Sequence, residues 1–209
     1  MNTTVVLIRH GETEWNKLGK FQGGTDIALS DDGIKQAELL RDRINGDFDY
    51  IYASPLSRAF ETAKIVASNS NSRVIIAPEI REINFGEWEG LTIKGISEKY
   101  PEIFKVWKTD KVEGNFIGGD LSIHNASNRA TKCILDIVRK HEGKKIVIVA
   151  HGGIIKAGLI GIFEWDMTMY HKMLLGNTCI NTIIFNKEMK PILGCLNDTN
   201  HLNAEVKTV

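Results

Sequence analysis

Two short apolar runs constrain the fold of this chain more than any other feature of its sequence. Residues 4–8 (TVVLI) and 145–150 (KIVIVA) are rich in β-branched residues and do not alternate regularly with polar ones. This pattern is typical of central strands in a parallel sheet, where helices cover both faces. Residues 50–54 (YIYAS) and 73–77 (RVIIA) repeat it. The sequence therefore predicts a mainly parallel sheet that contains these four strands.

Helical patterns separate the strands. The first begins after Ser30, which suits an N-cap, and ends at Gly46. Its apolar side is expected to comprise Ile34, Ala37, Leu40 and Ile44. Further helices are predicted over residues 57–68 and 126–143, and Gly143 closes the second of these. Because strands alternate with helices, we expect an α/β fold arranged as a three-layer α/β/α sandwich.

Two regions depart from this alternation. Residues 179–186 and 190–196 are joined by a short turn, which predicts an antiparallel pair at the edge of the sheet. Between about residues 85 and 122 the sequence has short helical pieces and a glycine-rich loop, without a strand pattern. We expect one domain over residues 1–209, with this small and mostly helical insertion lying over the cleft.

Composition narrows the possible partners. Lysine plus arginine equals aspartate plus glutamate, at 26 each, so the chain lacks the basic excess that attracts nucleic acid or an anionic membrane surface. There is no apolar run of ~18 residues and no signal-peptide pattern at the N-terminus. The three cysteines are widely spaced, as expected for free thiols in a reducing compartment. We expect a cytoplasmic protein, either a monomer or a homodimer.

Charged residues follow the predicted strands at the point where each strand ends. Arg9 and His10 come directly after residues 4–8 in the stretch VVLIRHGETEWN. His151 ends the strand at 145–150, Glu82 comes soon after residues 73–77, and Arg58 lies in the first turn of the helix that follows residues 50–54. Because the carboxyl ends of parallel strands share one edge, these side chains are expected to converge there. Two guanidinium groups and the amides of helix N-termini form an anion site, and phosphate matches it best.

Four segments in order resemble one protein family. LIRHGETEWN is similar to the RHGxTxxN signature of the histidine phosphatase superfamily, also called phosphoglycerate mutase-like. SPLSRAFETA resembles its second arginine motif, REINFGEWEG its LxExxFGxxEG acid motif, and VAHGG its second histidine motif. The resemblance is collinear from residue 5 to about residue 160. In size the chain is similar to the small bacterial phosphatases of this family, such as α-ribazole phosphatase.

The residues and the resemblance lead to the same assignment of roles. His10 is expected to attack phosphorus as a nucleophile, which divides one displacement into two easier steps. Arg9, Arg58 and His151 would stabilise charge on the phosphoryl oxygens. Glu82 is suited to protonate the leaving oxygen and then to accept a proton from water. The resemblance further implies that four residues help to hold the phosphate: Asn16, Gln22, Gly23 and Gly152.

Two other classes of function could use some of the same residues. In a metal hydrolase, His10, Glu82 and His151 would bind zinc. Arg9 and Arg58 argue against a divalent ion, since two permanent cations beside it would repel it, and we expect neither a metal nor another cofactor. In a non-catalytic module that only binds a phosphorylated ligand, the histidine or the acid is usually lost, whereas both are present here.

Hydrolysis and phosphoryl transfer remain alternatives within the family. A phosphoglycerate mutase needs extra cations for a second phosphate, but the insertion offers only scattered lysines: Lys94, Lys99, Lys105, Lys108 and Lys111. We therefore expect a phosphomonoester hydrolase, with phosphoglycerate mutase as the alternative. Its substrate is expected to be a small phosphorylated metabolite, such as α-ribazole phosphate or a sugar phosphate. Residues 119–121 (GDL) replace the GES triplet of many members, which leaves the substrate open.

The acid motif also contains two aromatic residues. Trp88 is interpreted as lining the substrate pocket and Phe85 as a core residue. The histidines outside the motifs are expected to have surface or packing roles: His124, His141, His171 and His201.

Overall fold

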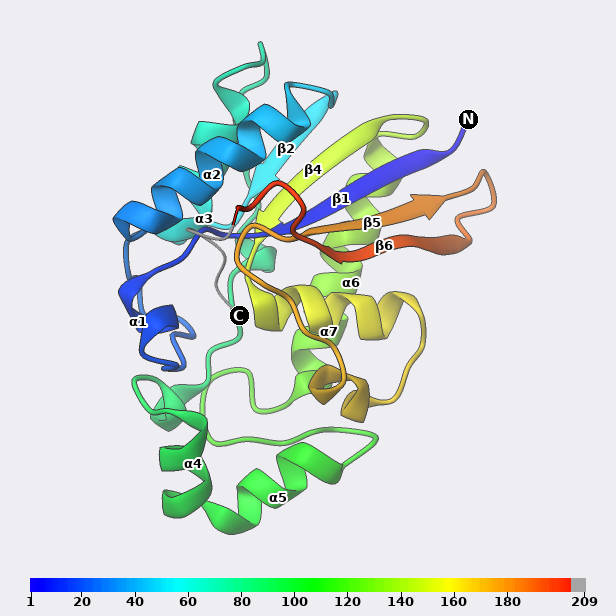
Figure 1. Cartoon of the computed structure of the whole chain (residues 1–209). Coiled ribbons are helices and arrows are strands. Elements are labelled where there is room, and N and C mark those ends of the chain that lie inside the picture. Colours follow the sequence, from blue (N-terminus) through cyan, green and yellow to red (C-terminus); the bar gives the residue numbers. More distant parts are fainter. Residues whose placement is uncertain (204–209) are drawn as a thin grey trace.

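One six-stranded sheet with helices on both faces forms the centre of the molecule (Figure 1). The computed structural model describes residues 1–203. The strands lie in the order β3-β2-β4-β1-β5-β6. Their bounds are β1 (Thr3–Arg9), β2 (Tyr50–Ala53), β3 (Val74–Ile76), β4 (Lys145–Ala150), β5 (Ile180–Phe185) and β6 (Pro191–Asp198). All six predicted strands are therefore confirmed.

The pairing of the strands brings the predicted site residues to one edge. β1 pairs in parallel with β4, β4 with β2, and β2 with β3, whereas β5 and β6 form the antiparallel edge. The register sets Arg9 opposite Ala150. His10 and His151, the next residues along each strand, consequently leave the sheet side by side. The prediction of a mainly parallel sheet with an antiparallel edge is confirmed.

Helices α2 (Asp31–Ile44) and α3 (Ser57–Ala67) cover one face of the sheet. Ser30 caps α2, since its hydroxyl accepts a hydrogen bond from the Gly33 amide. The predicted buried side of α2 is partly wrong, because Ile34 is 41% exposed and Gln36 is fully buried. The Gln36 side-chain oxygen accepts a hydrogen bond from the Glu12 amide at 2.9 Å, so this polar residue faces the loop that follows β1.

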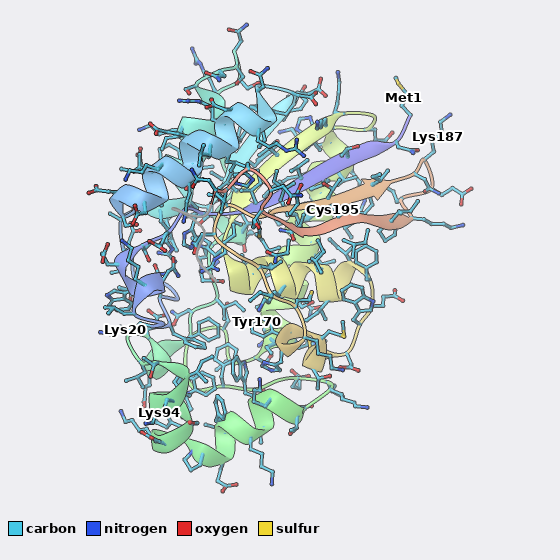
Figure 2. All side chains as sticks on the ribbon, in the orientation of Figure 1. Met1, Lys20, Lys94, Tyr170, Lys187 and Cys195 are labelled. Atoms are coloured by element: carbon cyan, nitrogen blue, oxygen red, sulfur yellow. The ribbon has the colours of Figure 1, made fainter. Side chains whose placement is uncertain are left out.

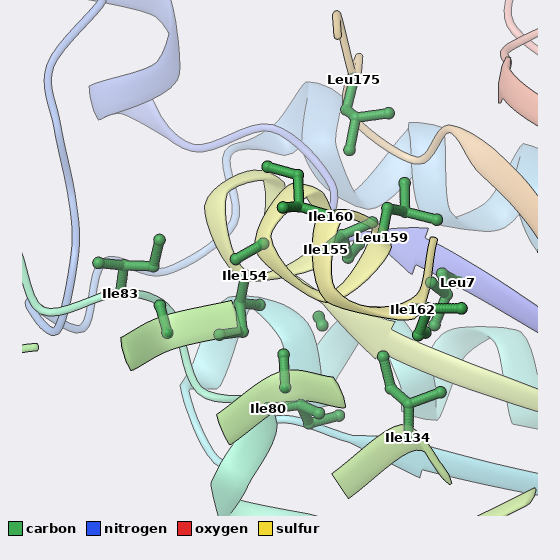
Figure 3. Packing of buried hydrophobic residues seen from close by; sticks show 14 of the residues in the cluster. Leu7, Ile80, Ile83, Ile134, Ile154, Ile155, Leu159, Ile160, Ile162 and Leu175 are labelled. Carbon is green, nitrogen blue, oxygen red and sulfur yellow. The ribbon is translucent and has the colours of Figure 1, made fainter. Parts of the chain in front are cut away.

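Helices α6 (Ile123–Lys140) and α7 (Gly152–Ile162) cover the other face, and Figure 3 shows buried side chains of the core that they help to form. The α7 helix is apolar on most sides, and it buries Ile154, Ile155 and Leu159 between α6 and the sheet. The α6 helix begins at Ile123 rather than at residue 126, because the Ser122 hydroxyl accepts a hydrogen bond from the Asn125 amide. It ends at Lys140, and residue 143 belongs to the following turn.

The remaining elements surround the cleft end of the sheet. They are helices α1 (Glu14–Lys17), α4 (Ile93–Lys99) and α5 (Pro101–Thr109), and the 3-10 helices η1 (Pro78–Ile80), η2 (Gly86–Trp88) and η3 (Met167–His171). In Figure 1 the α4–α5 pair lies beyond α1 and α7, where the insertion was predicted. Within residues 1–203, no helix is long and apolar enough to cross a membrane.

An aromatic cluster holds the insertion against the rest of the chain. Trp88 is fully buried and packs edge-on against Trp107 of α5, with ring centroids 5.2 Å apart. The interpretation of Trp88 as a pocket residue is therefore wrong. Phe85, interpreted as core, is buried but also lines the pocket described below. Of the four histidines expected to have packing or surface roles, His141 and His171 form ring contacts with aromatic side chains.

Candidate active site

A cavity of about 200 Å³ opens at the carboxyl ends of the parallel strands. Eight of the nine residues predicted for the site line it: Arg9, His10, Asn16, Gln22, Gly23, Arg58, Glu82 and Gly152. The ninth, His151, lies directly behind His10, with ring centroids 5.1 Å apart. The structure thus brings together side chains from five separate segments of the sequence.

The His10 ring is held in one tautomer. Its Nδ1 lies 2.6 Å from the carbonyl oxygen of Gly11. Because a carbonyl oxygen can only accept a hydrogen bond, the proton resides on Nδ1 and Nε2 keeps its lone pair. Burial, followed by the charges of Arg58 and Arg9, lowers the pKa of His10 well below its ordinary value. The ring is therefore neutral at neutral pH, and its Nε2 atom can attack an electrophile.

The His151 ring is anchored at one nitrogen and open at the other. Its Nε2 lies 2.7 Å from the hydroxyl oxygen of Ser54, the residue that follows β2. Nδ1 is buried and, within residues 1–203, lacks a hydrogen-bond partner. Burial, then Arg58 and His10, lowers the pKa of His151 well below its ordinary value. If Ser54 donates to Nε2, the single ring proton resides on Nδ1 and can be donated to an anion.

Backbone carbonyls fix the orientation of both arginines. The fully buried Arg58 donates to the carbonyl oxygens of Thr25 and Gly23, each at 2.9 Å. Arg9 donates to the carbonyl oxygen of Leu175 at 2.6 Å. In the described part of the chain, the Nε atom of each guanidinium is buried without a partner. A buried donor without a partner is costly, so each arginine has an N–H group that is available to a bound anion.

The Glu82 carboxylate is tied to the start of α7. It accepts hydrogen bonds from the amides of Gly153 at 3.0 Å and Ile154 at 2.8 Å, and from the amide of Ile83 at 2.8 Å. A β-carbon at Gly153 would lie 2.7 Å from the Glu82 carboxylate and 2.8 Å from the Tyr170 hydroxyl. Only glycine lets the acid approach the helix this closely. The same contacts hold Glu82 in the wall of the cavity.

A second carboxylate organises the loop that positions Arg58. Glu89 accepts hydrogen bonds from the amides of Gly24, Thr25 and Phe85 and from the hydroxyl of Thr25, at 2.7–3.1 Å. Thr25 in turn accepts from Arg58. Glu89 belongs to the acid motif, but its contribution depends on a long-range contact that spacing alone does not predict.

Several residues of the cavity wall were missed by the sequence analysis: Lys20, Phe21, Gly153, Lys156, Tyr170 and Leu175. Lys156 follows Gly152 by four residues on α7, so both face the same side of the helix. Burial and the charge of Arg9 lower its pKa to about 8. None of the five lysines considered in the insertion lines the cavity. Among the described residues, no group of three or more histidine, cysteine or carboxylate side chains is arranged to hold a metal ion.

Comparisons with known proteins agree with this geometry. The model of the histidine phosphatase superfamily (branch 1) matches residues 5–199. Phosphoserine phosphatase 1 of Hydrogenobacter thermophilus is 33% identical over 199 residues, which cover 95% of this chain and 93% of the relative. A metal-independent phosphoserine phosphatase of Arabidopsis thaliana is 30% identical over 205 residues, or 97% of this chain and 84% of the relative.

A solved structure extends the similarity to three dimensions. It is a mutant phosphoserine phosphatase of Entamoeba histolytica in complex with phosphoserine. The two chains are 41% identical and superpose with a TM-score of 0.91, over 96% of this chain and 100% of the other.

Proposed function

This chain belongs to the histidine phosphatase superfamily and is a phosphomonoester hydrolase, and we propose that phosphoserine is its substrate. The observation that carries the proposal is the His10 ring. Its Nε2 atom is unprotonated, and the ring lines a small cavity together with Arg9 and Arg58. The relatives described above support phosphoserine in particular. The cavity, at about 200 Å³, has room for a short phosphorylated acid.

In the first proposed step, the Nε2 atom of His10 forms a bond to phosphorus while the bond from phosphorus to the serine oxygen breaks. The serine oxygen leaves with the electron pair of that bond and takes a proton from Glu82. Arg9, Arg58 and the Nδ1–H group of His151 stabilise the charge on the phosphoryl oxygens. Four more lining residues complete the wall around the phosphoryl group: Asn16, Gln22, Gly23 and Gly152.

In the second step, water attacks phosphorus and the bond from phosphorus to Nε2 breaks. The Glu82 carboxylate accepts a proton from this water, so the acid of the first step serves as the base of the second. Inorganic phosphate leaves, and His10 returns to its starting tautomer because the Gly11 carbonyl oxygen holds the Nδ1 proton throughout. In a mutase, a hydroxyl group of the substrate would attack phosphorus in place of this water.

Phosphate release from a panel of monoesters tests this proposal. We expect the largest kcat/KM for phosphoserine, with α-ribazole phosphate and glucose 6-phosphate slower by at least about tenfold. In a parallel assay, conversion of 3-phosphoglycerate to 2-phosphoglycerate should be much slower than phosphate release, even with 2,3-bisphosphoglycerate present. Faster hydrolysis of another ester would replace phosphoserine as the substrate, and faster isomerisation would establish the mutase instead.

A further inference from the structure

The cavity carries more positive charge than a phosphate group alone requires. Four cationic side chains line it, and Glu82 is the one carboxylate among the lining residues within the described chain. Arg9 and Arg58 serve the phosphate end, beside His10. Lys20 and Lys156 are additional. A second anionic group on the substrate would account for this excess.

Lys156 is the cation whose surroundings point most clearly to a ligand. Its Nζ atom lies over the Tyr170 ring, 5.2 Å from the ring centre, in the wall of the cavity. Tyr170 lies between α7 and the insertion (Figure 2). No ion pair with Lys156 is found among residues 1–203. By contrast, Lys94 forms an ion pair with Glu98 on the surface.

The position of Lys156 along α7 places it beyond the phosphate end. Gly152 and Gly153 begin the helix beside Arg9 and Glu82. Lys156 follows one turn later, which corresponds to about 5.4 Å along the helix axis. In phosphoserine, two carbon atoms separate the ester oxygen from the carboxylate carbon. A substrate with its phosphate at His10 therefore extends its carboxylate toward the Lys156 side of the cavity.

We propose that Lys156 is the specificity-determining residue that binds the carboxylate of the substrate, an inference that rests on the proposed function of this site. A half-buried ammonium group close to the Arg9 guanidinium is unfavourable unless an anion pairs with it. A carboxylate provides that anion, and the Tyr170 ring holds the ammonium from the side. The enzyme would accordingly prefer phosphomonoesters that carry a carboxylate two carbons from the ester oxygen.

A matched pair of substrates tests Lys156 directly. Phosphoserine and O-phosphoethanolamine share the phosphate and the ammonium group, and differ only in the carboxylate. The Lys156→Met variant should lose about 10- to 100-fold in kcat/KM for phosphoserine, the effect expected for a lost hydrogen-bonded charge. It should change kcat/KM for phosphoethanolamine by less than about threefold. Lys156→Arg, which keeps the charge, should restore part of the preference.

A surface variant provides the control. Lys94 is 84% exposed and lies on α4, outside the cavity (Figure 2). Lys94→Met makes the same change in net charge and should leave both substrates unaffected. Equal losses on both substrates in Lys156→Met would overturn the proposal, because they would mean that Lys156 supports the phosphate end.

A second pair separates this inference from the identity of the substrate. 3-Phosphoglycerate and glycerol 3-phosphate differ by a carboxylate in place of a hydroxymethyl group. If wild-type enzyme does not hydrolyse phosphoserine but shows a Lys156-dependent preference for 3-phosphoglycerate, the proposed substrate is wrong and the carboxylate site stands. If phosphoserine is hydrolysed and the ratio for each pair is the same in wild type and Lys156→Met, the proposed substrate stands and the carboxylate site is wrong.

Discussion

The two ends of the cavity are built in different ways. At the phosphate end, backbone groups fix the functional side chains: His10 on the Gly11 carbonyl, Arg58 on two loop carbonyls, and Glu82 on the amides of α7. At the far end, Lys156 and Tyr170 meet through a cation–π contact between two elements. The first end has the rigidity that catalysis of one reaction requires. The second end depends on a side-chain contact between α7 and η3, and it is the end to which we assign substrate preference.

Replacement of Glu82 should break the phosphate end most severely. Glu82→Gln cannot supply a proton to the leaving oxygen, which is usually worth ~10²–10⁴-fold. We expect a loss of that size in kcat for phosphoserine and a far smaller loss for p-nitrophenyl phosphate, whose phenolate leaves without a proton. The exposed Glu79, changed to Gln, is the matched control. Similar losses on both esters would assign Glu82 a positioning role only.

Replacement of Glu89 should also impair catalysis at the phosphate end, but less than replacement of Glu82. Glu89→Gln replaces one carboxylate oxygen with an NH₂ group, which cannot accept a hydrogen bond, so either residue 24 or residue 25 loses its acceptor. With the loop loosened, Arg58 loses its fixed orientation, and kcat/KM should fall about 10- to 100-fold.

This loss should be the same for phosphoserine and phosphoethanolamine, since Glu89 acts on the phosphate end alone. Glu87→Gln, at an exposed position two residues away, is the control. A change in the ratio of the two substrates would show that the two ends are not independent. Thermal unfolding of each variant would reveal any general loss of stability.

The smallest expected effect is a change of substrate preference with pH, which tests the far end of the cavity separately from the phosphate end. The pKa of Lys156 is lowered to about 8, so its ammonium is protonated below that pH and neutral above it. The ratio of kcat/KM for phosphoserine to that for phosphoethanolamine should therefore fall severalfold as pH rises through about 8. Both substrates carry the same phosphate and ammonium groups, so their own titrations largely cancel in the ratio.

Charged and titratable groups around Lys156 should not produce this change. Four of these groups shift the pKa of Lys156: Arg9, Glu82, Lys108 and Cys179. Arg9 stays charged, and burial raises the pKa values of Cys179 and of the adjacent Tyr170. In Lys156→Met the ratio should be independent of pH between about 7 and 9. A wild-type ratio that is flat over this interval would contradict the assignment.

The difference between the two ends also explains what the sequence could predict. Arg9, His10 and His151 follow strands whose apolar patterns are clear, and parallel pairing brings such positions to one edge. The phosphate end was therefore predictable from local pattern and topology. Glu89 was not, because its role depends on the contact between its own loop and residues 24 and 25.

The residues of the far end could be recognised only from the structure, for the same reason. Lys156 stands in an apolar helix, where a single lysine predicts only a solvated position. Its spacing of four from Gly152 was the available signal, but this signal gains meaning only once Gly152 is placed in the cavity wall. Tyr170 approaches the cavity from a segment outside every motif. Trp88 was misplaced because its burial is set by packing against Trp107, a contact between distant segments.

Identification of the phosphorylated atom during turnover is the most direct test of the account. Rapid quenching with alkali, followed by mass spectrometry and ³¹P NMR, should find one phosphoryl group on His10, stable in alkali and released by acid. The same adduct should form from phosphoserine and from p-nitrophenyl phosphate, because both ends of the cavity serve one nucleophile. In His10→Ala the adduct and turnover should both disappear. An acid-stable adduct on another residue, or full turnover by His10→Ala, would contradict the central claim that the neutral His10 ring carries the phosphoryl group.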